Sequence, residues 1–184
     1  MAAVLIPLAQ GCEELEAVTV IDLLRRAGID VVTAGLDHHP VRASRGVVLI
    51  PDTSLDEALK RDYDMVVLPG GAQGAEQLSR DPRVHDLLIK MASNGKFTAA
   101  ICAAPKVLGA AGLLRGKRAT GYPGILGAMN FADVTVTDDP LVQDGKVITS
   151  RGPGTAMDFA LALIETLAGT PKRDEVEAQL VRAP

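Results

Sequence analysis

One cysteine stands where the chain is predicted to turn from a buried strand directly into a helix. The apolar segment 97–101 predicts the strand, and Pro105 suits the first turn of a helix predicted over 104–111. Cys102 lies at this turn beside Ala103, and small neighbours relieve the crowding there. A helix N-terminus favours the thiolate, so one interpretation is a nucleophile. The other is a buried cysteine that packs as a small hydrophobe, and the spacing alone does not separate them.

Glu16 offers a carboxyl group suited to proton transfer. It lies in a helix predicted over 13–27, next to the apolar Leu15. A buried carboxyl has a raised pKa and can hold a proton at neutral pH. Glu13 and Glu14, in the first turn of the same helix, have a simpler explanation, because negative charge there complements the helix dipole.

Two adjacent glycines follow a strand predicted over 65–68. Gly70 and Gly71 carry no side chain that covers their backbone N–H groups, and an oxyanion hole requires uncovered N–H groups. A tight turn without a catalytic role explains the same glycines, and both interpretations stay open.

The three histidines do not indicate a base for Cys102. His38 and His39 lie in a polar loop, and His85 lies in a predicted surface helix. Glu16 is therefore the better candidate for proton transfer. No cluster of His, Asp or Glu has metal-ligand spacing, and the chain has neither a GxGxxG turn after its first strand nor a GxxxxGK[ST] loop. We expect no metal and no cofactor.

Short apolar runs alternate with amphipathic stretches along the whole chain. Strands are predicted at 3–6, 30–34, 47–50, 65–68 and 97–101, with a hairpin over 141–148 that turns at Asp144-Gly145. Helices are predicted at 13–27, 55–59, 82–94, 104–111, 155–168 and 172–181, with Thr155 and Asp158 as a capping-box-like pair. The alternation indicates an α/β fold, with a mostly parallel sheet covered on both faces and sites at the C-terminal strand ends. We expect one domain over residues 1–184.

Composition excludes several classes of protein. The 184 residues are 47% hydrophobic and 23% charged, which is typical of a folded globular chain. Nineteen Lys and Arg against 23 Asp and Glu give a net charge of −4, a poor match to nucleic acid. Two cysteines are too few for a disulfide-built fold, and no apolar run reaches the ~20 residues that span a bilayer. The apolar stretch 2–9 lacks a basic start, so we expect a cytoplasmic protein with free thiols and no membrane partner.

Six motifs in order resemble the ThiJ/PfpI superfamily, most closely the protein deglycase branch, associated with Parkinson disease, and its bacterial relatives. The matching segments are 11–18, 25–28, 44–47, 67–71, 99–105 and 149–155. The resemblance covers nearly the whole chain and implies a flavodoxin-like three-layer sandwich and a homodimer.

The resemblance also implies roles for particular residues. It makes Cys102 an oxidation-sensitive nucleophile and Glu16 a protonated acid that hydrogen-bonds the cysteine. It places the backbone amides of Gly70, Gly71 and Ala103 at the site, Arg45 in the substrate pocket, and Arg26 across the dimer interface.

The sequence departs from the family at two positions. Tyr122 stands where the best-known members carry a histidine. Peptidase-like members carry a histidine directly after the cysteine, and Ala103 stands there instead, which disfavours a Cys–His protease. Cys12 has no implied role; a packed or loop-exposed bystander is preferred over a thiol that resolves oxidised Cys102.

Two functions of different classes remain. The first is a cofactor-independent glyoxalase or deglycase acting on methylglyoxal, glyoxal or their adducts, with Cys102 as nucleophile and Glu16 as proton carrier. The alternative is a redox-sensing or chaperone-like protein of oxidative stress, in which the same thiol is oxidised. A flavin-binding function is disfavoured, because the first strand is not followed by a phosphate-binding Ser/Thr loop and the chain has five aromatic residues (Phe 3, Tyr 2, Trp 0).

Overall fold

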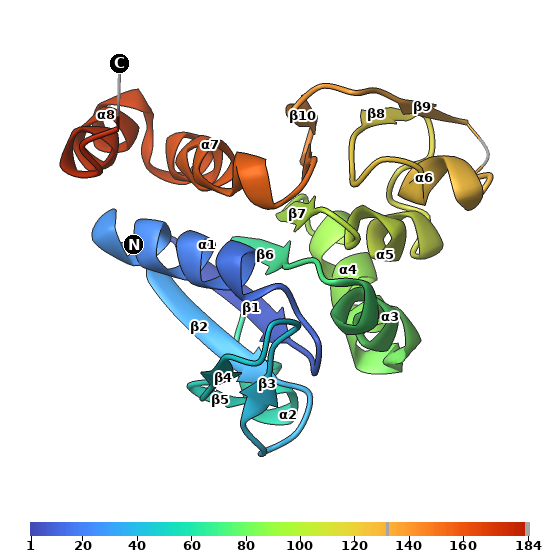
Figure 1. The fold of residues 1–184 in the computed structure, drawn as a ribbon, viewed down its shortest axis with the longest axis horizontal. Coiled ribbons are helices and arrows are strands. Elements are labelled where there is room, and N and C mark those ends of the chain that lie inside the picture. Colours follow the sequence, from blue (N-terminus) through green and yellow to red (C-terminus); the bar gives the residue numbers. More distant parts are fainter. Residues whose placement is uncertain (132, 183–184) are drawn as a thin grey trace.

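A seven-stranded sheet forms the centre of the molecule (Figure 1). The computed structural model describes residues 1–131 and 133–182, and within them the strand order is β10-β11-β7-β6-β1-β2-β5. The strands are β1 (Ala3–Leu8), β2 (Asp30–Gly35), β5 (Thr53–Ser54), β6 (Met65–Leu68), β7 (Phe97–Ile101), β10 (Leu141–Asp144) and β11 (Val147–Ser150). Neighbouring strands are parallel except for the antiparallel pair β10–β11, so the expected mostly parallel sheet is confirmed.

Helices cover both faces of this sheet (Figure 1). One layer holds α1 (Glu14–Arg26), α7 (Ala156–Ala168) and α8 (Thr170–Gln179), which pack on one another. The opposite layer holds α3 (Ala72–Arg80), α4 (Pro82–Ser93) and α5 (Pro105–Ala110), with the short α2 (Leu55–Ala58) against β2 and β5. None of the described helices is long and apolar enough to cross a membrane.

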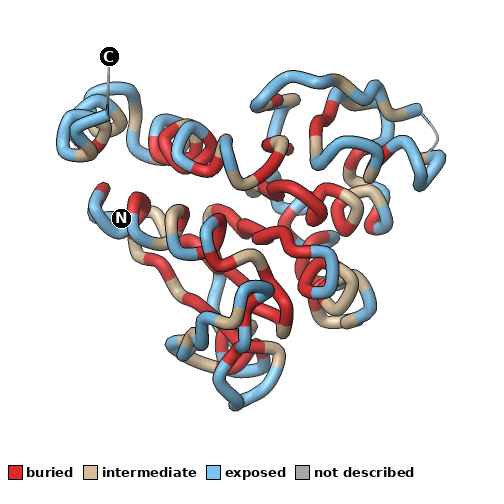
Figure 2. The backbone as a smooth tube through the Cα atoms, viewed as in Figure 1, coloured by how far each residue is buried: buried red, intermediate tan, exposed pale blue. Residues whose placement is uncertain are grey.

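The core lies along the central strands (Figure 2). Every residue of β6 is buried, and so are all residues of β1 and β7 after the first. A parallel strand covered by helices on both faces has no solvated side, which explains why these segments are continuous apolar runs rather than alternating ones. The same burial fixes the ends of β1, β6 and β7, where the candidate site residues stand.

The elements outside this core depart most from the sequence-based expectations. Residues 47–50 were expected to form a strand of the main sheet; instead β4 (Val48–Leu49) pairs with β3 (Val41–Arg42) in a separate antiparallel ribbon. The parallel pair β8 (Lys117–Ala119) and β9 (Val134–Val136), and the short α6 (Ile125–Ala128), were not predicted. These segments are short and partly exposed, so they lack a long apolar pattern.

Three local predictions need correction. Helix α3 was not predicted, because Gly74 lies inside it and the Gly70-Gly71 pair precedes it. The 141–148 hairpin exists, but Asp144 pairs with Val147, so the turn is Gly145-Lys146 rather than Asp144-Gly145. Thr155 does not form the capping box expected with Asp158, because its hydroxyl donates to the Gly152 carbonyl at 2.9 Å.

Candidate active site

Cys102 occupies the turn between β7 and α5, as the sequence predicts. Its φ is +63°, a left-handed conformation that non-glycine residues rarely adopt. The turn is held because the Cys102 amide donates to the Ser150 carbonyl at 3.0 Å and the Ala104 amide donates to the Ile101 carbonyl at 3.0 Å. Cys102 is 8% exposed. Strained backbone of this kind is characteristic of functional sites, and Cys102 is buried but not completely enclosed.

Glu16 is fully buried in the first turn of α1. Its Oε2 accepts a hydrogen bond of 2.8 Å from the Gly70 amide, while Oε1 has no partner among the described residues. Burial raises the pKa of Glu16 to about 7, with a smaller increase from the Glu13 charge, against the lowering effect of the Gly70 and Cys102 hydrogen bonds. A carboxyl with this pKa exchanges a proton readily near neutral pH.

Gly70 brings the thiol and the carboxyl together. A Cβ at this position would stand 2.5 Å from Glu16 Oε2 and 2.6 Å from Cys102 Cβ, so only glycine fits between the two side chains. The sequence suggests an oxyanion-binding role for the Gly70 amide, and this stays a prediction. In the structure that amide already donates to Glu16, so it positions the carboxyl.

The backbone amides of Gly71 and Ala103 face the Cys102 sulfur. Hydrogen bonds from both amides lower the pKa of the thiol, but burial and the Glu16 carboxylate outweigh them and raise it to about 12. The expected gain of thiolate at a helix N-terminus is therefore not the dominant effect. A proton on Glu16 removes the charge repulsion, so the protonation of the carboxyl and that of the thiol are coupled.

The loop after β6 packs tightly on the loop after β1. Gly71 has φ +85°, and a Cβ on it would stand 2.7 Å from the Glu13 nitrogen, while a Cβ on Gly74 would stand 2.7 Å from the Cys12 Cα. The Glu13 amide donates to the Gly70 carbonyl at 3.0 Å. The glycines therefore permit the close approach that sets Glu16 opposite Cys102.

Glu14 has a role that the sequence analysis did not find. Beyond its place at the positive end of the α1 dipole, its carboxylate accepts from the Arg45 amide at 2.9 Å and from the Ser44 hydroxyl at 3.1 Å. Burial raises the pKa of Glu14, but hydrogen bonds from its own backbone amide, from the Arg45 amide, from the Ser44 hydroxyl and from the Val47 amide outweigh burial and lower it. Glu14 thus ties the loop between β3 and β4 to the start of α1, and the Arg45 side chain lies exposed on that loop. The signal in the sequence was weak, because the partners lie about 30 positions away.

Tyr122 lies beside Cys102. Arg26 of the same chain lies far from it. The Tyr122 amide donates to the Cys102 carbonyl at 2.7 Å, and the residue is 52% exposed. Arg26 pairs with Asp22 at 2.9 Å in the last turn of α1. It stands ten residues after Glu16, about 15 Å along the helix axis.

Cys12 is packed and unused by this arrangement. It is fully buried, and burial, followed by the Glu14 charge, raises the pKa of its thiol to about 11. Both cysteines are free. This agrees with a packed residue rather than with a loop-exposed thiol.

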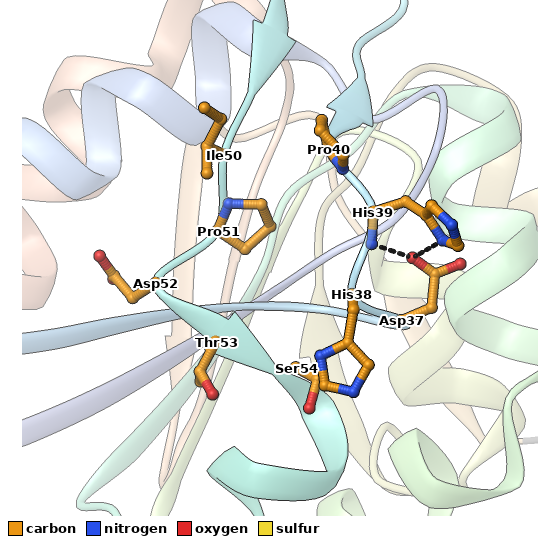
Figure 3. A pocket seen from close by; sticks show the side chains of 9 residues that line it. All are labelled: Asp37, His38, His39, Pro40, Ile50, Pro51, Asp52, Thr53 and Ser54. Carbon is orange, nitrogen blue, oxygen red and sulfur yellow. Dashed lines mark hydrogen bonds and ion pairs between the residues drawn. The ribbon is translucent and has the colours of Figure 1, made fainter.

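The histidines lie outside the cysteine site. His38 and His39 line a hollow of about 340 Å³ formed by 37–40 and 50–54 (Figure 3). Within it Asp37 accepts from the His39 amide at 2.8 Å, and Asp52 is bonded to Thr33 and Arg25. The carboxylates there are already engaged by the protein. No group of three or more potential metal ligands occurs among residues 1–131 and 133–182.

Comparison with known proteins points to one family. The DJ-1/PfpI family model matches residues 2–166. Protein DJ-1alpha of Drosophila melanogaster is 48% identical over 174 residues, covering 94% of this chain and 80% of that protein. Protein DJ-1 homolog A of Arabidopsis thaliana is 42% identical over 183 residues; these are 98% of this chain and 47% of that protein, so the chain spans about half of its length. Glutathione-independent glyoxalase DJR-1.2 of Caenorhabditis elegans is 35% identical over 175 residues, 95% of this chain and 92% of that protein.

Solved structures give the same result. Drosophila melanogaster DJ-1beta superposes with a TM-score of 0.94 at 45% identity, over 100% of this chain and 99% of that chain. Oxidized Toxoplasma gondii DJ-1 superposes with a TM-score of 0.93 at 37% identity, over 100% of both chains. The expected flavodoxin-like α/β sandwich is confirmed by these neighbours.

Proposed function

The chain belongs to the DJ-1/PfpI family, and from that premise we propose that it is a cysteine-dependent glyoxalase or deglycase that requires no cofactor. Its substrates are methylglyoxal, glyoxal or the adducts they form with thiols and amines. One observation carries the proposal: Gly70 holds the buried Glu16 carboxyl directly against the Cys102 turn. The name of the Caenorhabditis elegans relative supports the same class of reaction.

The first step is addition of Cys102 to the aldehyde. The sulfur forms a bond to the aldehyde carbon of methylglyoxal, and the carbonyl π electrons move to the oxygen, giving a hemithioacetal. The amides of Gly71 and Ala103, which face the sulfur, stabilise the developing oxyanion. The proton of the thiol passes to Glu16, whose raised pKa makes it an acceptor when ionised and a donor when protonated.

The second step is proton transfer between the two substrate carbons. Glu16 first returns the thiol proton to the oxyanion, which completes the hemithioacetal and leaves the carboxyl ionised again. It then takes the proton from the former aldehyde carbon, the electron pair forms the C=C bond, and the proton passes to the neighbouring carbonyl oxygen, giving an enediol. Glu16 next takes the proton of the hydroxyl on the first carbon. Return of a proton to the second carbon gives a thioester of a 2-hydroxy acid. Water then cleaves the thioester and releases the hydroxy acid and the free thiol, so no external oxidant or reductant is needed. Exposed Tyr122 and Arg45 border the pocket in this proposal, and Arg45 suits the carboxylate of the product.

The direct test measures hydroxy-acid formation from methylglyoxal by the wild type and two variants. We expect Cys102→Ser to abolish turnover and Glu16→Gln to lower it by at least about 100-fold, because each removes a group that acts on the reacting atoms. Full activity of Cys102→Ser would remove the proposed mechanism. Full activity of Glu16→Gln would leave the nucleophile in place and remove the proton carrier.

The redox alternative rests on the same cysteine. Cys102 retains 8% exposure, and a protonated Glu16 beside it suits a hydrogen bond to a sulfinate oxygen. Intact-mass spectrometry after graded peroxide tests this function. Oxidation of Cys102 ahead of Cys12, with negligible methylglyoxal turnover, favours a sensor or chaperone-like protein; resistance of Cys102 removes it.

We also propose that the chain forms a homodimer. Exposed apolar side chains gather along one face of α1 and on the neighbouring ribbon: Val18 and Ile50 line one groove, and Leu15 and Val48 are about half exposed. A patch of this kind is unusual on a monomer. Arg26 lies at the end of this face of α1, where a second copy brings it within reach of the partner's site. Sedimentation of the wild type as a dimer and of Val18→Glu as a monomer is the expected result; a monomeric wild type contradicts it.

A further inference from the structure

A salt bridge joins the two helices that follow the turns of the candidate active site. Lys106, in the first turn of α5, places its Nζ 2.9 Å from Oε2 of Glu76 in the middle of α3. Helix α5 starts three residues after Cys102, and α3 starts directly after Gly71. The bridge therefore connects the element that carries the thiol to the element that carries one of the amides facing it.

This bridge is unlike the other lysine ion pairs of the described residues. The Lys106 side chain is 16% exposed, whereas the other paired lysines range from 30% to 67%; the Glu76 side chain is 45% exposed. Water screens the Glu76 end of the pair, so the bridge adds little to the unfolding free energy; what distinguishes it is that the packed Lys106 stem holds the ammonium in one place. A lysine in the first turn of a helix is disfavoured by the helix dipole. The position of Lys106 in α5 is therefore not explained by helix preference. It is explained by the ion pair with Glu76 of α3.

Glu76 divides its two carboxylate oxygens between different partners. Oε1 lies 2.8 Å from Arg80, one turn further along the same helix, and Oε2 lies against Lys106. The Arg80 contact stays within α3 and cannot fix the helix relative to anything else. Only the Lys106 contact of Glu76 crosses to α5.

The opposite side of α3 is fixed by glycine contacts. The Gly74 amide donates to the Gly11 carbonyl at 3.2 Å, and a Cβ on Gly74 would stand 2.7 Å from the Cys12 backbone. Helix α3 is thereby held between the loop that leads to Glu16 and the helix that follows Cys102. Gly71 is the N-cap residue of α3, so any shift of the helix moves its amide.

We propose that the Lys106–Glu76 salt bridge is a positioning device, which sets the place of the Gly71 amide relative to the Cys102 sulfur and so controls the rate of the chemical step. Lys106 and Glu76 touch no reacting atom and act through Gly71. The proposal rests on the cysteine-dependent activity proposed above. An oxyanion donor that is displaced rather than removed costs less than its deletion, so loss of the bridge lowers kcat by about tenfold.

The test compares Lys106→Met, Glu76→Gln and the double variant, with methylglyoxal turnover and Cys102 alkylation by iodoacetamide as readouts. We expect kcat to fall about tenfold in each single variant, with KM unchanged, and no further fall in the double variant. The pH midpoint of Cys102 alkylation rises in all three, because the Gly71 amide that lowers the pKa of the thiol has moved. Lys106→Arg keeps the bridge and restores both readouts.

The matched control is Arg80→Met, which removes the other partner of Glu76 and leaves the bridge to α5 intact. It keeps the wild-type kcat and alkylation midpoint. Wild-type kcat and midpoint in Lys106→Met would overturn the proposal, and so would effects of the two single variants that add fully in the double variant. If the wild type fails to convert methylglyoxal, the proposed function fails, whereas the alkylation midpoints still decide whether the bridge positions Gly71.

Discussion

The Gly70 amide donates a hydrogen bond of 2.8 Å to Glu16 Oε2, and a Cβ at Gly70 would clash with the same oxygen. The backbone of the β6–α3 loop is thus the support on which the buried carboxyl rests. Because the same glycine also contacts Cys102 Cβ, one residue without a side chain sets the separation of the thiol and the carboxyl.

Gly70→Ala is expected to abolish activity. The new methyl group meets Glu16 Oε2 and Cys102 Cβ at distances that real Cβ atoms do not adopt, so both groups must move. Displacement of reacting groups by about 1 Å costs about 100-fold in turnover, and overpacking costs about 1–3 kcal/mol of unfolding free energy. Turnover of methylglyoxal and urea unfolding measure the two effects.

Gly127→Ala is the matched control for this substitution. Gly127 lies in α6, its φ is not positive, and a Cβ there would meet nothing within 4 Å. It should retain full activity and equal or slightly greater stability, because alanine favours a helix over glycine. Equal effects of the two substitutions would show that Gly70 has no special place in the site.

The sequence predicts the turn at Cys102 because its determinants are local: an apolar strand, small neighbours and a proline that opens the next helix. The roles of Gly70 and Glu14 depend on partners 54 and about 30 positions away, so no local pattern contains them. Helix α3 was missed for a different reason, since its glycine at 74 is required by the contact with Cys12 rather than by the helix itself. The sequence therefore predicts a reactive residue whose surroundings are local, such as Cys102. The hydrogen bonds that hold the other site residues in place depend on distant segments, which only the fold brings together.

Cys12 is expected to resist modification in the folded protein. It is fully buried, whereas Cys102 is 8% exposed, and burial raises the pKa of both thiols, so access to the reagent separates the two cysteines. Iodoacetamide should label Cys102 alone under native conditions and both cysteines in denaturant, as read by peptide mass spectrometry. Cys12→Ala should keep methylglyoxal turnover, and native labelling of Cys12 at the rate of Cys102 would contradict the burial of its thiol.

Glu14→Ala is expected to loosen the β3–β4 loop. The substitution removes the acceptor of the Arg45 and Val47 amides and of the Ser44 hydroxyl, at a cost of about 1–3 kcal/mol. Hydrogen exchange of the Arg45 amide should become faster, and the stability of the protein should fall. Glu13→Ala, which removes only one contact to the Ser44 hydroxyl, serves as the comparison and should leave the Arg45 amide protected.

Glu16 should give the unfolding free energy a specific pH dependence. Its pKa is raised from 4.5 in the ordinary carboxyl to about 7 in the folded chain, chiefly by burial, so the folded state binds the proton more tightly than the unfolded state. The stabilisation is therefore fully present below about pH 4.5 and is lost as the pH rises through about 7. Its size is on the order of 3 kcal/mol.

The measurement is the difference in unfolding free energy between wild type and Glu16→Gln across pH 4.5 to 8. The groups that face Glu16 are Cys102, Glu13 and Cys12, and both thiols have pKa values near or above 11, so neither titrates in this range. The glutamine keeps an acceptor for the Gly70 amide but cannot ionise, so its stability should lack the decline that the wild type shows between about pH 4.5 and 7. Glu175→Gln, on the exposed face of α8, should keep the wild-type decline. A wild-type curve parallel to that of Glu16→Gln would mean that the buried carboxyl does not change its protonation near neutral pH, and the proton transfer assigned to it would lose its physical basis.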